Sequence, residues 1–286
     1  MYRTAIPPPS WRAAALQRIE ASNVAGHDTH HSRAMNLEAI RGLLNGDPAY
    51  TLGIACVERV AFKEAVDSMA SVTGYSPDPE LTTGGGFIAP TATLRGLEEA
   101  ARRIADVAER GGRFLVATGH PGSLLLFCME LARLIRGWGG EVAEPARGVW
   151  VPPNLTLDYV AGVAVTTDGR SLPHTHDYRA MELMLEETEH VDLVIGDHGY
   201  AGAAINAGIP VVTLLDSNDP VPAVARRLGA DVTIIPADDN LAPSSYLPLT
   251  ELMCELVDRS WVEVGLPEYS VAWCDRRPES PGRPVS

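Results

Sequence analysis

The chain from residue 92 onward alternates between short, almost wholly apolar runs and helical patterns that close on glycine. The runs are RFLVAT, VDLVIG, IPVVTLL and DVTIIP, and each is followed by polar residues. Strands that are apolar at nearly every position are typical of a parallel sheet with helices on both faces. The alternation therefore predicts an α/β domain with a doubly wound, Rossmann-like, mostly parallel sheet.

The first 90 residues have a different pattern. SWRAAALQRIEAS, RAMNLEAIRGLLNG and VERVAFKEAVDSMASVTG carry apolar residues at helical spacing. GYSPDPELTTGGGFIAPT is rich in Pro and Gly, which favours a linker or a loop over the site. We therefore expect an N-terminal helical region and linker over residues 1–90, an α/β catalytic domain over 91–270, and a disordered tail over 271–286.

Charge and cysteine spacing exclude several classes of protein. A net charge of −14 disfavours binding to nucleic acid or to an anionic membrane, which needs a basic surface. No run approaches the ~20 apolar residues of a membrane span, and the first residues lack the apolar core of a signal peptide. The four cysteines stand singly, which indicates neither a disulfide framework nor a structural zinc site. A cytoplasmic protein with no membrane or nucleic-acid partner is the expectation.

The segment TGHPGS follows the first apolar run, at the end of a strand where ligands collect in parallel sheets. Gly119 and Gly122 let the backbone approach a ligand, and the helix beginning near Ser123 offers free amides to a phosphate. The segment matches neither the P-loop nor the GxGxxG fingerprint. A plain turn capped by Ser123 is the alternative, although such a turn does not need the imidazole of His120.

DHGYAG and DSNDP follow two further apolar runs and offer ligands for a metal. Asp197, His198 and Asp219 form a mixed oxygen and nitrogen set that suits Mg, Mn, Co or Ni. Asp216 offers a further oxygen, and Asn218 is a candidate phosphate ligand. The alternative is that the aspartates of DSNDP only cap the helix that follows, although burying Asp197 without a partner would be costly.

The sequence LPHTHDY adds His174 and His176, which face the same way if the segment is extended. Together with His120 they are the candidate catalytic residues, because imidazole transfers protons near neutral pH. An ordinary surface loop is the alternative.

Two other polar clusters are less informative. GHDTHH, with His27, His30 and His31, has the flanks of a solvated connector. PADDN, with Asp238 and Asp239, is typical of a turn before the last helix, although it also follows an apolar run.

The motifs ATGHPGSLL, HTHDY, GDHGYAGAA, DSNDP and PADDN, with NGDPAYTLGI upstream, resemble in order and spacing an actinobacterial family of phosphatases without assigned substrates. The resemblance covers residues 40–255. The arrangement of a helical N-terminal part before an α/β domain, with DHG and a later strand-end Asp, is also similar to that of the metal-dependent damage-control phosphatases. Those proteins hold their metal with Asp-Asn and a second Asp. In this chain His198 stands where that Asn would be.

These observations predict a metal-dependent phosphatase that hydrolyses a small phosphomonoester: a sugar phosphate, a nucleotide or a damaged phosphometabolite. A small phosphorylated metabolite is the expected partner, and a homo-oligomer is compatible with the sequence. A sugar-phosphate or nucleotide binder or isomerase without hydrolytic activity is one alternative, and a scaffold protein with purely structural strand-end polar residues is the other.

Overall fold

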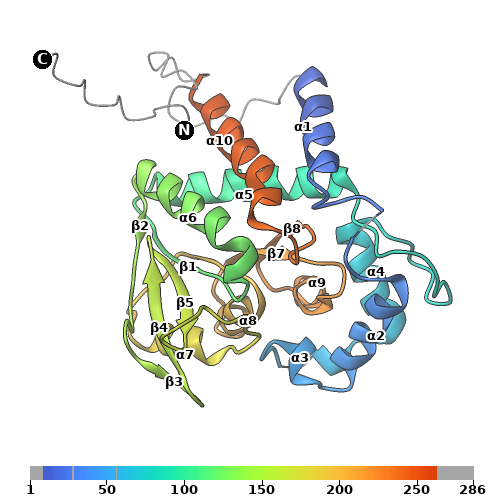
Figure 1. Ribbon diagram of the computed structural model, residues 1–286, viewed down its shortest axis with the longest axis horizontal. Helices are drawn as coiled ribbons and strands as arrows, with labels where there is room; N and C mark the ends of the chain where they lie inside the picture. The colour runs from blue at the N-terminus through green and yellow to red at the C-terminus, as the bar shows by residue number, and fades with distance from the viewer. Residues whose placement is uncertain (1–8, 28, 56, 263–286) are drawn as a thin grey trace, which may run out of the picture.

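The computed structural model describes residues 9–27, 29–55 and 57–262, so the predicted tail over 271–286 lies outside the described residues. The helices are α1 (Pro9–Ala21), α2 (Arg33–Leu44), α3 (Pro48–Thr51), α4 (Phe62–Thr73), α5 (Pro90–Ala108), α6 (Pro121–Gly137), α7 (Arg179–Glu186), α8 (His198–Asn206), α9 (Pro220–Arg227) and α10 (Leu247–Val262), with short 3-10 turns η1 (Val57–Arg59) and η2 (Pro243–Tyr246). The strands are β1 (Arg113–Ala117), β2 (Glu141–Val142), β3 (Trp150–Val151), β4 (Leu155–Val160), β5 (Val163–Thr167), β6 (Leu193–Ile195), β7 (Val211–Leu215) and β8 (Val232–Pro236) (Figure 1).

The strands form one eight-stranded, mostly parallel sheet in the order β3-β4-β5-β1-β6-β7-β8, with β2 beside the start of β1. The four predicted apolar runs are β1, β6, β7 and β8, which lie side by side and parallel. The mixed α/β class and the mostly parallel sheet are thus confirmed.

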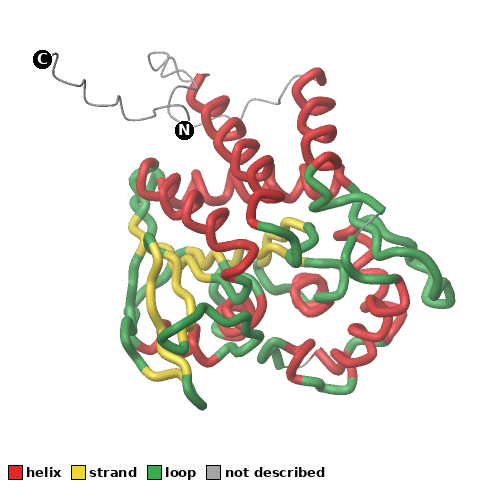
Figure 2. The backbone as a smooth tube through the Cα atoms, in the orientation of Figure 1, coloured by secondary structure: helices red, strands yellow, loops and turns green. Residues whose placement is uncertain are grey.

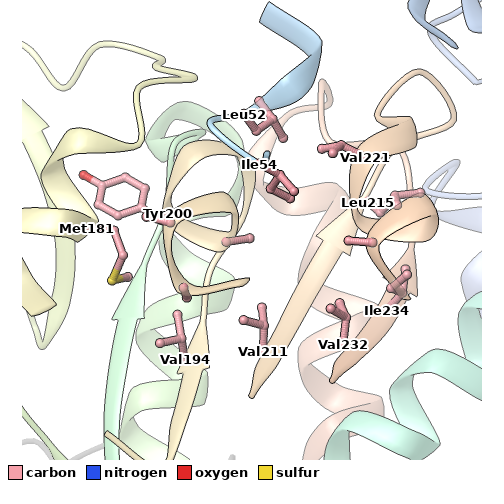
Figure 3. Packing of buried hydrophobic residues seen from close by; sticks show 14 of the residues in the cluster. Leu52, Ile54, Met181, Val194, Tyr200, Val211, Leu215, Val221, Val232 and Ile234 are labelled. Atoms are coloured by element: carbon pink, nitrogen blue, oxygen red, sulfur yellow. The ribbon is translucent and has the colours of Figure 1, made fainter. Parts of the chain in front are cut away.

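Two apolar cores lie on opposite faces of this sheet, because successive side chains of a strand point to opposite sides. Leu115 of β1 belongs to the core formed with α2, α4, α7, α8 and α9, whereas Phe114 and Val116 belong to the core formed with α1, α5, α6 and α10. Figure 3 shows the first core, where Tyr200 of α8 lies beside Met181 of α7. Burial on both faces explains why the central strands are apolar at nearly every position.

The antiparallel edge of the sheet was not predicted from the sequence. β3, β4 and β5 form a meander in which β4 turns into β5 at Ala161 and Gly162, both with positive φ (52° and 96°). β4, which pairs with β3 and β5, alternates between buried and less buried residues, as expected of an antiparallel strand with one face in the core.

Helices α1, α2 and α4 lie in the N-terminal part of the chain, and Asn45 and Gly74 cap the C-terminal ends of α2 and α4. The predicted irregular segment between α4 and α5 is loop for most of its length (Figure 2). It pairs with the α1–α2 connection through two isolated bridges, Gly26 to Ile88 and Ser32 to Gly85. Among the described helices, none combines the length and apolar composition needed to cross a bilayer.

Candidate functional site

The carboxyl ends of β1, β6, β7 and β8 meet along one edge of the sheet, because these strands are adjacent and parallel. The segments that leave these ends carry His120, Asp197, His198, Asp216, Asp219, Asp238 and Asp239. The order of the strands therefore brings together motifs that are far apart in the sequence, as the sequence-based prediction requires.

Asp197 follows β6 and is 2% exposed. Its Oδ1 accepts a hydrogen bond from the amide of Gly119, at 3.1 Å, which ties the ends of β6 and β1 together. Its Oδ2 lies 3.2 Å from Nδ1 of His198 and 3.5 Å from Nδ1 of His120, without a hydrogen bond to either. One carboxylate oxygen thus orients the side chain and the other is directed at two imidazoles.

His198 lies at the centre of the site and is 4% exposed. Its φ of 46° is rare for a residue with a side chain and costs of order 1–3 kcal/mol, so the surrounding contacts must hold it in place. Its Nδ1 is 2.8 Å from Nδ1 of His120, and its Nε2 lies 3.3 Å from Asp219 and 3.5 Å from Asp239. This ring therefore contacts groups from β1, β7 and β8 at once.

The loop that carries His174 and His176 covers these imidazoles. His174 stacks on His120 with ring centroids 3.8 Å apart, and His176 stacks on His198 at 4.3 Å. Nδ1 of His176 lies 2.7 Å from the carbonyl oxygen of Ala49, in the N-terminal region. The structure thus brings all three predicted catalytic histidines and all three predicted metal ligands into one cluster.

Two glycines let this loop pack against the strand ends. A Cβ on Gly199 would lie 2.4 Å from the carbonyl oxygen of His176, and a Cβ on Gly119 would lie 2.4 Å from that of Thr175. The amide of Thr175 also donates to the carbonyl of Gly119, at 2.9 Å. Close backbone contact, which only glycine permits here, fixes the distance between the histidine loop and α8.

A second group of carboxylates lies beside His198, at the ends of β7 and β8. Asp216 and Asp238 are 0% exposed and Asp239 is 4% exposed. The amides of His30 and Asn240 donate to the two oxygens of Asp238, at 2.7 Å and 3.0 Å. Oδ2 of Asp216 and Oδ2 of Asp239 are buried without a hydrogen-bond partner.

The N-terminal segment adds a histidine that the sequence analysis had treated as part of a solvated connector. Nε2 of His31 lies 3.3 Å from Oδ2 of Asp216, and the ring is 16% exposed. The segment is held by Thr29, whose hydroxyl donates to the carbonyl of Gly86, and by the amide of Gly86, which donates to the carbonyl of His31 at 2.5 Å. The connector interpretation is wrong for Thr29 and His31, because pairing of the two loops buries Thr29 and half-buries His31, whereas His27 and His30 are exposed.

The charges in the site shift several pKa values strongly. Burial raises the pKa of Asp197, but the adjacent imidazoles of His120 and His198, 3.5 Å and 3.2 Å from its Oδ2, outweigh burial and leave the pKa below the usual range. Burial lowers the pKa of His198, but Asp219 and Asp197 outweigh it and leave the pKa well above the usual range. The pKa of Asp219 falls for the complementary reason: burial raises it, and the charge of His198 lowers it by more. His198 is thus stabilised as a cation between carboxylates.

The pKa values of two further carboxyl groups are raised, and those of two further histidines are lowered. Burial and the neighbouring carboxylates raise the pKa values of Asp216 and Asp239 well above the usual range. Burial and the surrounding histidines lower the pKa of His174 to about 4 and also lower the pKa of His176. The site therefore holds carboxylates that lack sufficient positive charge, next to imidazoles that are neutral near neutral pH.

The predicted phosphate-binding residues lie at the same edge of the sheet, but they differ in whether their polar groups are free to bind a ligand. The amide of Gly119 is already bonded to Asp197, and the amide of Ser123 bonds the carbonyl of His120. Gly122, in the first turn of α6, is exposed with open space beside it. Oδ1 of Asn218 is buried without a partner, and such an acceptor suits a cation or a hydroxyl better than a phosphate oxygen.

Sequence reasoning gave too little weight to Asp238, Asp239 and His31. The first two follow β8 as Asp197 follows β6, so their strand-end position was the available signal. His31 had no such signal, because its place depends on pairing between two loops.

Three overlapping groups of side chains offer ligand atoms that all lie within 4.8 Å of one another. They are His120, His174 and His198; His198, Asp219 and Asp239; and Asp216, Asp238 and Asp239. Carboxylates with imidazoles suit Mn, Co, Ni and related divalent ions, and an all-carboxylate set suits Mg or Mn. The buried oxygens without partners fit the same conclusion, because a cation would neutralise them.

The chain resembles known proteins over most of its length. A protein-family model described as Phosphatase matches residues 11–260. The chain is also 35% identical over 257 residues to the Streptomyces coelicolor protein named Phosphatase SCO2771, and the match covers 86% of this chain and 95% of that protein.

Proposed function

The chain belongs to this phosphatase family, and from that membership we propose that it hydrolyses a small phosphomonoester with the help of a divalent cation. A sugar phosphate, a nucleotide or a damaged phosphometabolite is the substrate class we favour. The observation that carries the proposal is the position of His198, whose ring nitrogens lie 3.2–3.5 Å from carboxylate oxygens of Asp197, Asp219 and Asp239.

Asp197, His198 and Asp219 are the ligands we assign to the cation. Their donor set fits a divalent ion, and Oδ2 of Asp197 is a buried acceptor without a hydrogen-bond partner. Cation binding at His198 requires its neutral imidazole, so the ion would replace the proton that the carboxylates now favour. When bound, such an ion offsets phosphoryl charge and makes a bound water more acidic, with Mg, Mn, Co or Ni as candidates.

His120, His174 and His176 are the proton-transfer residues of the proposal. The pKa values of His174 and His176 lie below the usual range, so both imidazoles are neutral near neutral pH and have a nitrogen free to accept a proton from the attacking water. Protonation of the leaving oxygen is the other role open to an imidazole at these positions. Since His174 is exposed at the mouth of the cluster, it is also the histidine best placed to meet the substrate.

The phosphate position we propose is the first turn of α6. This helix of 17 residues directs its positive dipole end toward the cluster, and the space beside Gly122 admits a ligand. Gly119 then acts by holding Asp197 rather than by contacting phosphate. The hydroxyl of Ser123 and the side-chain amide nitrogen of Asn218 are donors and remain candidate phosphate contacts.

We also assign the α/β part, predicted over residues 91–270 and described up to residue 262, to the doubly wound, Rossmann-like class, with the described residues before 91 as an N-terminal region. Helices on both faces of parallel strands support this assignment. So does the position of the cluster at the carboxyl ends of adjacent strands, where ligands collect in such sheets.

Phosphate release from a panel of phosphomonoesters tests the function, with EDTA and with each added divalent ion. We expect hydrolysis that needs a cation and falls at least about 100-fold in Asp197→Asn, which keeps the shape of the side chain but removes its charge. Asp106→Asn, a carboxylate on the exposed side of α5, is the matched control and should keep full activity.

Either of two results would contradict the proposal. Hydrolysis that survives EDTA and the Asp197→Asn change would separate activity from this cluster. Saturable binding of a phosphomonoester without release of phosphate, under every cation, would favour the non-hydrolytic alternative.

A further inference from the structure

The carboxylates of Asp216, Asp238 and Asp239 form a group next to the cation ligands assigned above but distinct from them. Their oxygens lie within 4.8 Å of one another, and all three residues are buried. They come from two adjacent strands, β7 and β8, whose carboxyl ends are in register at Leu215 and Pro236. The sheet therefore fixes their separation.

Among the described residues, no arginine or lysine pairs with this group, and the histidine cation beside it, His198, contacts Asp239 alone of the three. The ion pairs of Asp216 and Asp239 among the described residues are all to histidines, and the closest to Asp216 is Nε2 of His31, at 3.3 Å. Oδ2 of Asp216 and Oδ2 of Asp239 are buried acceptors without a hydrogen bond. Burying such an oxygen without a partner costs about 1–3 kcal/mol or more of folding free energy. Two such oxygens side by side therefore indicate a ligand that the protein chain does not supply.

The third carboxylate is held as a metal ligand commonly is. Backbone amides of His30 and Asn240 bond the two oxygens of Asp238 and fix its orientation. An ionised carboxylate has about four acceptor positions, so both oxygens keep lone pairs for a cation. Outer hydrogen bonds of this kind orient ligands and are part of most metal sites.

We infer that Asp216, Asp238 and Asp239 bind a second divalent cation, beside the one held by Asp197, His198 and Asp219. Asp239 lies between the two positions, 3.5 Å from Nε2 of His198 and within the carboxylate group, so it is the ligand that both cations share. His31, from the N-terminal segment, lies against Asp216 and either joins this second set or orients that carboxylate.

The inference deepens the proposed function and rests on it for its chemical meaning. Two cations that share a carboxylate offset the charge on both the attacking and the leaving oxygens of a phosphoryl group. Cation binding itself is independent of hydrolysis, so it can be measured separately.

The experiment is the stoichiometry of Mn²⁺ binding to the full chain by equilibrium dialysis, with bound metal measured by mass spectrometry. We expect two equivalents in the wild type, one in Asp216→Asn and one in Asp197→Asn. Asp106→Asn should keep two. Electron paramagnetic resonance adds a second readout, because two neighbouring Mn²⁺ ions give a spin-coupled signal that Asp216→Asn should convert to that of a single ion.

One equivalent in the wild type, unchanged in Asp216→Asn, would overturn the second position and leave the phosphatase proposal intact. Two equivalents without any phosphate release would support the second position and contradict the phosphatase proposal. Should Asp216→Asn fail to fold, Asp238→Asn replaces it, with the same expected loss of one equivalent.

Discussion

The contact between Gly199 and the histidine loop allows a quantitative prediction for the Gly199→Ala variant. The added Cβ would lie 2.4 Å from the carbonyl oxygen of His176 and 2.4 Å from the carbonyl carbon of Asp177, whereas ordinary contact begins at 3.4 Å. Both are backbone atoms and cannot rotate away. The loop must therefore move by about 1 Å relative to α8, or α8 must move.

The expected effects on stability and on activity differ in size. Overpacking of this kind costs roughly 1–3 kcal/mol, which corresponds to a fall in Tm of roughly 2–12 °C at about 2–4 °C per kcal/mol. A displacement of about 1 Å at reacting groups can reduce the rate about 100-fold. His176 stacks on His198, so the displacement acts directly on the proposed site. We expect a folded protein with a modest loss of Tm and a much larger loss of activity.

The assay combines calorimetry with the rate of phosphate release at saturating cation. Gly137→Ala is the matched control, since no atom lies within 4 Å of its added Cβ and its φ is not positive. The control should keep its activity and its Tm, or gain slightly in Tm from the better helix propensity of alanine. A Gly199→Ala protein with wild-type activity and Tm would refute the reasoning, because the histidine loop would then not be packed on α8.

Two further predictions concern the charges and the buried arginine. In EDTA, the free energy of unfolding should fall as pH rises from the usual carboxyl range through the raised pKa values of Asp216 and Asp239, because the folded chain retains protons that the unfolded chain has lost. Urea unfolding at stepped pH should show a smaller slope in Asp216→Asn, and an equal slope would contradict this account. Arg33 donates to the carbonyls of Ser76, Asp78 and Leu81 at 2.9–3.1 Å, so Arg33→Met should lower the free energy of unfolding by about 2–4 kcal/mol. In Arg33→Met, amide hydrogen exchange should become faster over residues 75–82. Arg41→Met changes an exposed arginine of the same helix and should leave that exchange rate unchanged. An unchanged exchange rate in Arg33→Met would contradict the prediction.

The central sheet could be predicted because its strands are buried on both faces and so are apolar at nearly every position. Strand β4 lacks that signal because one of its faces is less buried, and its pairing with β5 is set by a turn at Ala161 and Gly162. Local sequence does not specify that turn conformation strongly, since Ala161 is not a residue that favours positive φ.

The candidate site was predictable in its residue types and not in its full membership. Asp197, His198 and Asp219 follow apolar runs, and strand ends at one edge of a parallel sheet must lie near one another. Which strands are neighbours decides the contacts, and the pattern within each strand carries no information on that order. His31 reaches the cluster through pairing of two loops without regular structure, for which sequence periodicity gives no signal.

The bond between the amide of His30 and Asp238 spans 208 residues, and this separation bears on how the protein is made. A ribosome releases the N-terminal segment first, and the carboxylates of β8 emerge only near the end of synthesis. The nascent chain therefore carries Val24 and His30 without their common partner Asp238 for most of translation, and such distant contacts form late in folding. A chain that terminates before β8 would lack Asp238 and Asp239 and could not assemble the carboxylate group. Synthesis through Asp239 is thus a condition for the proposed metal chemistry.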